Sequence, residues 1–260
     1  MSSRAEEKAA RRAEREAAQA KQQASAQRKK RLSILGGVVA LAAIVVVGAI
    51  LISQSGTEDS EPGGSAEGKA AAALVGGIAQ DGLVLGDPDA PLTIEEYVDY
   101  QCPFCGQFSR EVFPTVLEEY VRTGKARVVL KPLTFLGEDS VTAARFAVAA
   151  GEQNRTWQFT EAFYAQQGEE NSGYVTDDFL RTVAADAGVD YDAAVEAQGS
   201  EAVTKALNDA QLEASRKGRD STPSFAMGPT GGEIEAVDAN PLEVGEFTDQ
   251  IDEQLAAAEK

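Results

Sequence analysis

Two cysteines separated by two residues are the only thiols in this chain of 260 residues, and they stand in the segment Cys102-Pro103-Phe104-Cys105. Thiols at this spacing can close a small disulfide ring and reopen it by exchange with an incoming thiolate. A disulfide across so short a loop adds little stability, so a redox dithiol is a better interpretation than a structural crosslink. A structural zinc site needs four ligands, and the chain has no histidine. We therefore expect neither a metal nor a cofactor.

The elements around the dithiol are expected to be a strand followed by a helix. An apolar, strand-like run from Leu92 to Asp99 leads into the first cysteine. Pro103 fits the first turn of a helix, where its missing N–H costs nothing. This helix should start at or next to Cys102, run to about Thr123 and bend at Pro114.

The start of a helix has a direct effect on thiol chemistry. Unpaired N–H groups and the positive end of the helix dipole favour a thiolate, so the pKa of Cys102 is expected to fall below the ordinary value of about 8.5. Cys105 lies one turn further along the helix and is shielded. It would act as the resolving thiol.

The remaining elements of the globular part predict a small mixed sheet. The expected order is β-α-β, a helical block, then β-β-α, which places helices within a connection of the sheet. The candidate elements after the first helix are a strand at 127–130, helices at 140–153, 157–167, 176–187 and 191–216, strands at 224–227 and 233–236, and a helix at 241–258.

These residues together resemble a known family. The dithiol after the strand Thr93–Gln101, the segment Trp157-Gln158-Phe159 in the helical block, and Ser221-Thr222-Pro223-Ser224-Phe225 near the end are similar to the DsbA-like thioredoxin-fold oxidoreductases, above all their membrane-anchored branch. The resemblance covers about residues 80–258. It implies a thioredoxin-like α/β fold with an inserted helical domain at about 138–217.

The resemblance also implies roles for individual residues. Cys102 would be the nucleophile and Cys105 the resolving thiol, with Pro103 and Phe104 supporting them from within the ring. The proline of the Thr222-Pro223 pair would be cis and face the disulfide, where it offers no N–H to compete with the sulfur.

Glu96 matches the buried acid of the family, which can relay the proton of the resolving thiol. A surface carboxylate on the strand is the alternative. Because Glu95 and Glu96 point to opposite faces of the strand, we expect one of the two to face inward.

Phe104 departs from the family pattern. Many members of the family that oxidise their substrates have histidine directly before the second cysteine, where a positive imidazole stabilises the thiolate. Phenylalanine offers no such charge. We therefore expect a reduction potential below the value of about −120 mV of the strongest oxidants.

An uncharged segment near the N-terminus predicts a membrane span. Residues 33–53 read SILGGVVALAAIVVVGAILIS, and at 1.5 Å per residue they are long enough to cross a bilayer core. No small-residue cleavage site follows, which favours an uncleaved anchor over a signal peptide. Basic residues 28–31 precede the span and acidic residues follow it, so the N-terminus should stay in the cytoplasm.

The chain is thus expected to have four parts. They are a basic cytoplasmic tail at 1–32, a single N-terminal transmembrane helix at 33–53, a flexible extracytoplasmic linker at 54–80, and the thioredoxin-fold domain at 81–260. Residues 1–32 hold ten Lys/Arg and four Asp/Glu, whereas the rest holds fourteen and thirty-eight. A globular part this acidic repels phosphate backbones, so nucleic acid is not an expected partner.

The function expected from these features is oxidative folding at the cell membrane. The dithiol, as a disulfide, would be donated to reduced secreted or cell-surface polypeptides. The resemblance implies regeneration by a membrane quinone-linked partner of the DsbB or vitamin K epoxide reductase type. A disulfide reductase or isomerase, and a non-catalytic thioredoxin-fold binding module, remain as alternatives.

Overall fold

The computed structural model describes residues 64–258. The predicted cytoplasmic tail, the predicted membrane span at 33–53 and the first part of the predicted linker lie outside these residues. Within residues 64–258, no helix is both long and apolar enough to cross a membrane.

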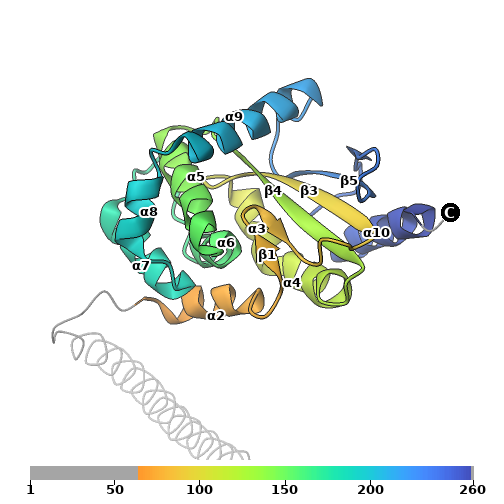
Figure 1. Ribbon diagram of the computed structural model, residues 1–260, viewed down its shortest axis with the longest axis horizontal. Coiled ribbons are helices and arrows are strands. Elements are labelled where there is room, and N and C mark those ends of the chain that lie inside the picture. The colour runs from red at the N-terminus through yellow and green to blue at the C-terminus, as the bar shows by residue number, and fades with distance from the viewer. Residues whose placement is uncertain (1–63, 259–260) are drawn as a thin grey trace, which may run out of the picture. The chain divides into compact units, whose positions relative to one another are not determined.

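A mixed sheet of six strands forms the centre of the described domain (Figure 1). Its order is β1-β2-β4-β3-β5-β6. The central strand β3 is parallel to β4 and antiparallel to β5, as expected for a β-α-β unit followed by a hairpin. The strands are β1 (Gln80–Asp81), β2 (Val84–Leu85), β3 (Leu92–Asp99), β4 (Ala126–Leu133), β5 (Ser224–Pro229) and β6 (Glu235–Ala236).

Both faces of β3 are covered, and all eight of its residues are buried. On one face Tyr97 packs with Ala210 and Ala214 of helix α9 (Glu201–Arg216). The other face belongs to the large core. Glu95 and Glu96 are consequently both buried, although we expected only one to face inward. The side chains of β3 alternate between the two faces as predicted, but helix α9 covers the second face as well.

The helix that follows the dithiol is interrupted close to the expected position. Helix α3 (Pro103–Glu111) ends before Val112, and α4 (Phe113–Val116) continues into a π-helical turn, η1 (Leu117–Val121). The proline at 114 has no N–H to donate to the preceding turn, which accounts for the break.

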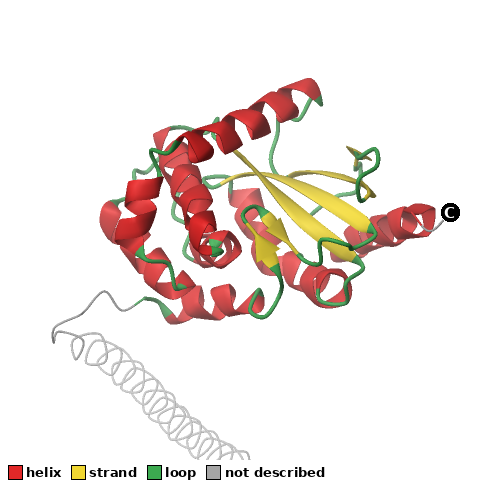
Figure 2. Cartoon of the chain, in the orientation of Figure 1, coloured by secondary structure: helices red, strands yellow, loops and turns green. Residues whose placement is uncertain are grey.

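A block of helices occupies the connection between β4 and β5, as expected (Figure 2). It contains α5 (Glu138–Ala150), the 3₁₀ turn η2 (Gly151–Gln153), α6 (Thr156–Ala165), α7 (Asp177–Ala187), α8 (Tyr191–Ala197) and α9. Aromatic side chains fill the space between this block and the sheet. Trp157 stacks on Phe113 with ring centroids 5.6 Å apart, so it belongs to the core.

The second half of the predicted linker differs from expectation, because it folds as helix α2 (Ala66–Leu74). The N-cap residue Ser65 accepts a hydrogen bond from the N–H of Gly68 and donates from its own N–H and hydroxyl to Asp186 of α7. In Figure 1, α2 lies beside α7. Its Ala-rich composition resembles that of a tether but also has a high helix propensity. The domain ends with α10 (Val244–Ala258), which packs on β5.

Candidate active site

The dithiol lies where β3 passes into α3. Cys102 is the N-cap residue of α3 in an extended conformation, and Pro103 occupies the first helical turn. The backbone N–H groups of Cys105 and Gly106 donate to the carbonyl of Cys102. Both thiols are free and buried, with 4% of Cys102 and none of Cys105 exposed. An incoming sulfur can therefore approach only Cys102.

A loop distant in sequence lies against this sulfur. The Thr222-Pro223 bond is cis, as the resemblance implies. The Sγ of Cys102 lies 3.2 Å from the carbonyl oxygen of Thr222 and donates a hydrogen bond to it. The sheet produces this approach, because β3 and β5 are hydrogen-bonded neighbours and both loops lie at the same end of the sheet.

The two thiols have opposite acidities. The pKa of Cys102 is lowered from about 9 to about 6, first by a hydrogen bond with the Cys105 thiol, against the opposing effect of burial. The Thr222 side chain and the backbone N–H groups of Cys105 and Phe104 lower it further. The expected low pKa is thus present, but its main cause is the second thiol rather than the amides of the helix start.

Burial is the main cause of the weak acidity of Cys105. It raises the pKa of this thiol well above 9, and the charges of Cys102 and Glu96 add to the effect. A dithiol with one acidic and one weakly acidic sulfur reacts in a fixed order. Such a difference would make Cys102 the sulfur that attacks or is attacked, and Cys105 the sulfur that is released or resolves.

Two acids are buried in the core, Glu96 on β3 and Glu161 on α6. Glu96 is 4% exposed, and burial raises its pKa well above the ordinary value, with the charge of Glu161 as the second cause. Glu161 on α6 is 2% exposed and accepts a hydrogen bond of 2.8 Å from the Ser109 hydroxyl of α3. Burial raises the pKa of Glu161 to about 8, although the Ser109 hydrogen bond opposes the change.

Sequence reasoning did not identify Glu161. Its aromatic neighbours Trp157, Phe159 and Phe163 are buried in the core, and the acid among them has no motif of its own. The available signal was a carboxylate between apolar residues at core spacing, because a charged residue is seldom buried without a reason.

Polar side chains that sequence reasoning also missed hold the loop before the dithiol. One oxygen of Asp99 accepts from the N–H of Gln101 and from the Ser140 hydroxyl, and the other accepts from the N–H groups of Phe135 and Leu136. The side-chain amide of Gln167 donates to the carbonyls of Tyr100 and Cys102. These hydrogen bonds hold the backbone before Cys102, and thus the position of its sulfur relative to the sheet.

The rim of the site is apolar. Phe104 is 56% exposed and carries no charge toward the thiols, as its type predicts. Phe135 is also exposed, on the loop that Asp99 ties to the residues before Cys102.

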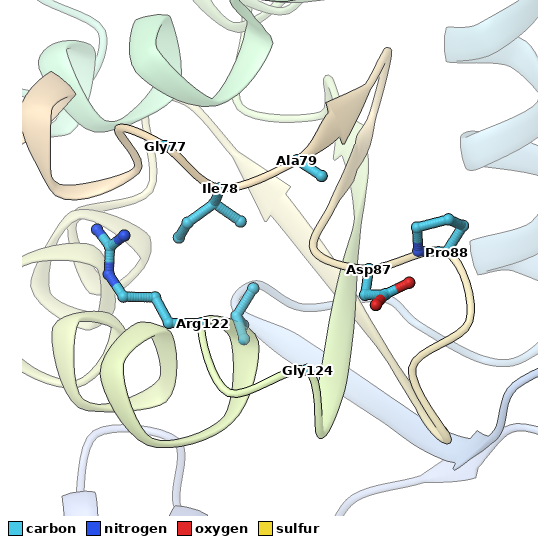
Figure 3. Close-up of a pocket in the computed structure, with 8 residues that line it drawn as sticks. Gly77, Ile78, Ala79, Asp87, Pro88, Arg122 and Gly124 are labelled. Carbon is cyan, nitrogen blue, oxygen red and sulfur yellow. The ribbon is translucent and has the colours of Figure 1, made fainter.

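A separate hollow lies away from the dithiol. Its lining includes Gly77, Asp87, Arg122 and Gly124, and none of the predicted site residues (Figure 3). Arg122 donates to the carbonyls of Leu74 and Gly76 at the end of α2. Its guanidinium therefore has a structural role in holding that helix end.

Comparison with known proteins places the chain in a family. A family model described as Thioredoxin matches residues 79–253, which is more than half of the chain. The chain belongs to the thioredoxin family. Within it, relatives named disulfide bond formation protein D and solved DsbA structures identify the chain as a DsbA-like thioredoxin-fold oxidoreductase.

Individual members of the thioredoxin family show the same relationship. A probable disulfide bond formation protein D of Bacillus cereus is 31% identical over 101 residues, which is 38% of this chain and 47% of the relative. This chain thus spans about half the length of that curated relative. The α-DsbA1 of Wolbachia pipientis is 26% identical with a TM-score of 0.58, covering 72% of this chain and 97% of the other. Oxidised BdbD of Bacillus subtilis, at 21% identity and a TM-score of 0.59 over 67% and 92% of the two chains, shares the fold.

Proposed function

We propose that this member of the thioredoxin family is a membrane-anchored, extracytoplasmic thiol-disulfide oxidoreductase. In its main reaction the Cys102–Cys105 disulfide is donated to reduced secreted or cell-surface polypeptides. Cys102 acts as the nucleophile and leaving group, and Cys105 as the resolving thiol. Thr222 and Pro223 flank the reacting sulfur, and Pro103 and Phe104 shape the ring.

The acidity difference between the two sulfurs is the observation that carries the proposal. With a pKa of about 6, Cys102 is largely a thiolate at neutral pH. A stable thiolate is a good leaving group, and its stability favours the reduced form of the dithiol, so the disulfide tends to oxidise other thiols. The name of the Bacillus cereus relative, a probable disulfide bond formation protein, agrees with this direction.

The surroundings of Cys102 suit a polypeptide substrate. The exposed ring of Phe104, between the two cysteines, offers an apolar contact for a bound chain, and Phe135 is exposed on the loop that Asp99 holds. Aromatic side chains are common anchors at protein interfaces. Contacts of this kind do not depend on a particular side chain, which fits an enzyme that accepts many unfolded chains.

The anchor and the regenerating partner complete the proposal. Residues 33–53 would hold the domain at the outer face of the membrane, with residues 1–32 in the cytoplasm. After each reaction the dithiol must lose two electrons. A membrane quinone-linked oxidase of the DsbB or vitamin K epoxide reductase type, facing the same side, would accept them.

Trapping thiols in intact cells tests the direction. Cells producing the full chain are quenched with acid, and free thiols are labelled with a maleimide that adds mass. A donor of disulfides is found mostly unlabelled, and it becomes labelled when the quinone-linked oxidase is removed. A mostly labelled protein in untreated cells contradicts the proposal and favours a reductase or isomerase.

The non-catalytic alternative is tested by a single substitution. Cys102→Ser keeps the shape of the site but cannot form a disulfide. If exchange is the function, this variant fails to restore disulfides in secreted proteins of cells lacking the wild-type chain. Restoration by Cys102→Ser would instead indicate a binding module.

A further inference from the structure

Arg219 lies in the loop between α9 and β5, where the end of α9 holds its backbone. Gly218, directly after the helix, is left-handed with a φ of 65°. The N–H of Arg219 donates to the carbonyl of Ala214 over 2.8 Å, and the N–H of Gly218 donates to the carbonyl of Ser215. These two bonds form a Schellman motif, which closes a helix and directs the residues that follow it. The backbone of Arg219 is therefore held in place without a substrate.

The guanidinium group of Arg219 has no ion-pair or hydrogen-bond partner in the described part of the chain. It lies over the ring of Tyr97, with its central carbon 6.0 Å from the ring centroid. Its Nε is buried without a hydrogen bond, and its other nitrogens donate to no residue among 64–258. An unpaired cation is unexpected here, because residues 33–260 hold fourteen Lys/Arg and thirty-eight Asp/Glu.

A second polar group without a partner lies beside the same ring. Ser224 is opposite Tyr97 in the antiparallel pair of β5 and β3, so the two side chains lie on the same face of the sheet. The hydroxyl oxygen of Ser224 is also buried without a hydrogen bond. Buried polar groups in native proteins are nearly always paired. A donor without an acceptor and a cation without a counter-ion both suit a ligand that carries a carboxylate.

This place is within reach of a polypeptide attached to Cys102. Arg219 precedes Thr222 by three residues, so their Cα atoms are at most about 11 Å apart. The carbonyl oxygen of Thr222 lies 3.2 Å from the Sγ of Cys102. An extended substrate advances about 3.3 Å per residue, so a carboxylate within about four residues of the substrate cysteine can meet the guanidinium.

We propose that Arg219 sets a substrate preference by binding an Asp or Glu side chain that lies close to the reacting cysteine of the incoming polypeptide. This inference rests on the proposed function, because it names which reduced polypeptides the dithiol prefers. Arg219 contacts the substrate and takes no part in the exchange of sulfur bonds. Its planar guanidinium is always charged and can donate two parallel hydrogen bonds to one carboxylate. The acidic surface of the domain repels other acidic segments, so the preference depends on the position of the carboxylate rather than on total charge.

The experiment measures exchange with peptides that differ in the position of one charge. The oxidised full chain is mixed at pH 7 with reduced peptides that contain one cysteine and either Glu or Gln at one of the four positions before or after it. Reactions are quenched with acid, the loss of the Cys102–Cys105 disulfide is quantified by mass spectrometry, and each rate is divided by the peptide thiolate concentration. At one or two positions the wild type should react about three- to fivefold faster with the Glu peptide than with the Gln peptide. Salt at about 0.5 M should reduce this ratio.

Substitutions show whether the guanidinium causes the ratio. Arg219→Gln should bring it to about 1 or below, since only the repulsion by the acidic surface remains. Arg219→Lys keeps the charge without the planar pair of donors and should retain part of the ratio. Arg216→Gln removes the same charge from an exposed position in the last turn of α9 and should match the wild type. The rate with the Gln peptide should be equal in all four proteins, because the dithiol is unchanged.

Several results would overturn this role of Arg219 and leave the proposed function standing. They are a ratio near 1 at every position in the wild type, an unchanged ratio in Arg219→Gln, and an equal loss in Arg216→Gln, which would assign the ratio to net charge. If Arg219→Gln does not fold, a wild-type ratio that salt does not reduce overturns the role instead. A wild-type chain that exchanges with none of the peptides overturns the proposed function as well.

Discussion

The Sγ of Cys102 donates a hydrogen bond to the carbonyl oxygen of Thr222 over 3.2 Å. A carbonyl can accept from a thiol but offers nothing to a thiolate. Ionisation of Cys102 therefore loses this contact, and other groups must compensate. The largest compensating contribution is the hydrogen bond with the Cys105 thiol.

Removal of the second thiol should consequently make Cys102 less acidic. In the wild type, the alkylation rate of Cys102 should rise with pH around a midpoint of about 6. In Cys105→Ala the midpoint should move upward by about one pH unit or more, because the thiolate loses its main hydrogen-bond donor. Cys105→Ser keeps a donor and should show a smaller change. An unchanged midpoint in Cys105→Ala would mean that the backbone amides of α3 dominate.

The residue before Cys105 should set the reduction potential. A nucleophile pKa of about 6 lies between the values of thioredoxin, about 7, and DsbA, about 3.5, so equilibration with glutathione should give a potential between about −270 and −120 mV. Phe104→His should raise it by about 30 mV or more, because an imidazolium stabilises the thiolate of the reduced form. Phe104→Leu is the control and should leave the potential unchanged. A value above −120 mV in the wild type would contradict this expectation.

A partly buried charge cluster on the opposite face of β3 should make stability depend on pH. Glu213 is surrounded by Lys131 at 2.6 Å and Lys217 at 2.7 Å. Burial alone would raise the pKa of Glu213, but the two lysines lower it to about 2. A lowered folded-state pKa stabilises the fold above the unfolded value of about 4.3, and this contribution is lost as pH falls toward 2.

Urea unfolding between pH 2 and 7 measures that contribution. Glu213→Gln should lose about 1 kcal/mol relative to the wild type at pH 7, since the group is partly exposed, and the difference should vanish near pH 2. Asp209→Asn breaks an exposed pair with Lys205 on the same helix and should change little at any pH. Equal losses for both variants would show that the cluster has no special role.

Asp99 should matter for both stability and reactivity. Its side chain accepts four hydrogen bonds and is fully buried. Asp99→Ala leaves these donors unpaired, so the free energy of unfolding should fall by about 2–4 kcal/mol. Asp99→Asn preserves the shape and should cost less. The rate of insulin reduction at a temperature where both variants are folded should fall in the same order, because the loop that carries Cys102 loosens.

The elements that depend on local sequence could be predicted. Pro103 at a helix start, the run of helices after β4 and the hairpin near the C-terminus could all be predicted, because each depends on residues close together in the chain. The cis bond at Pro223 could be predicted only through the resemblance.

The features that were not predicted depend on tertiary packing between distant elements. Glu95 is buried because α9 returns across the sheet, and Glu161 faces the core because α6 packs on α3. Helix α2 could be mistaken for a tether because its docking depends on Asp186, more than a hundred residues away. None of these partners is visible from local composition.

The neighbouring acids of β3 have opposite environments. Glu95 contacts Lys131 at 3.3 Å, Lys217 at 3.0 Å and the Tyr97 hydroxyl, whereas Glu96 forms no ion pair with a residue of the described domain, 64–258. A slip of the strand by a single position that moved Glu95 into the surroundings of Glu96 would bring Ile94 to the two lysines, which would then lack this counter-ion. The register of β3 therefore also determines the surroundings of the dithiol, and a shifted register is disfavoured by electrostatics as well as by packing.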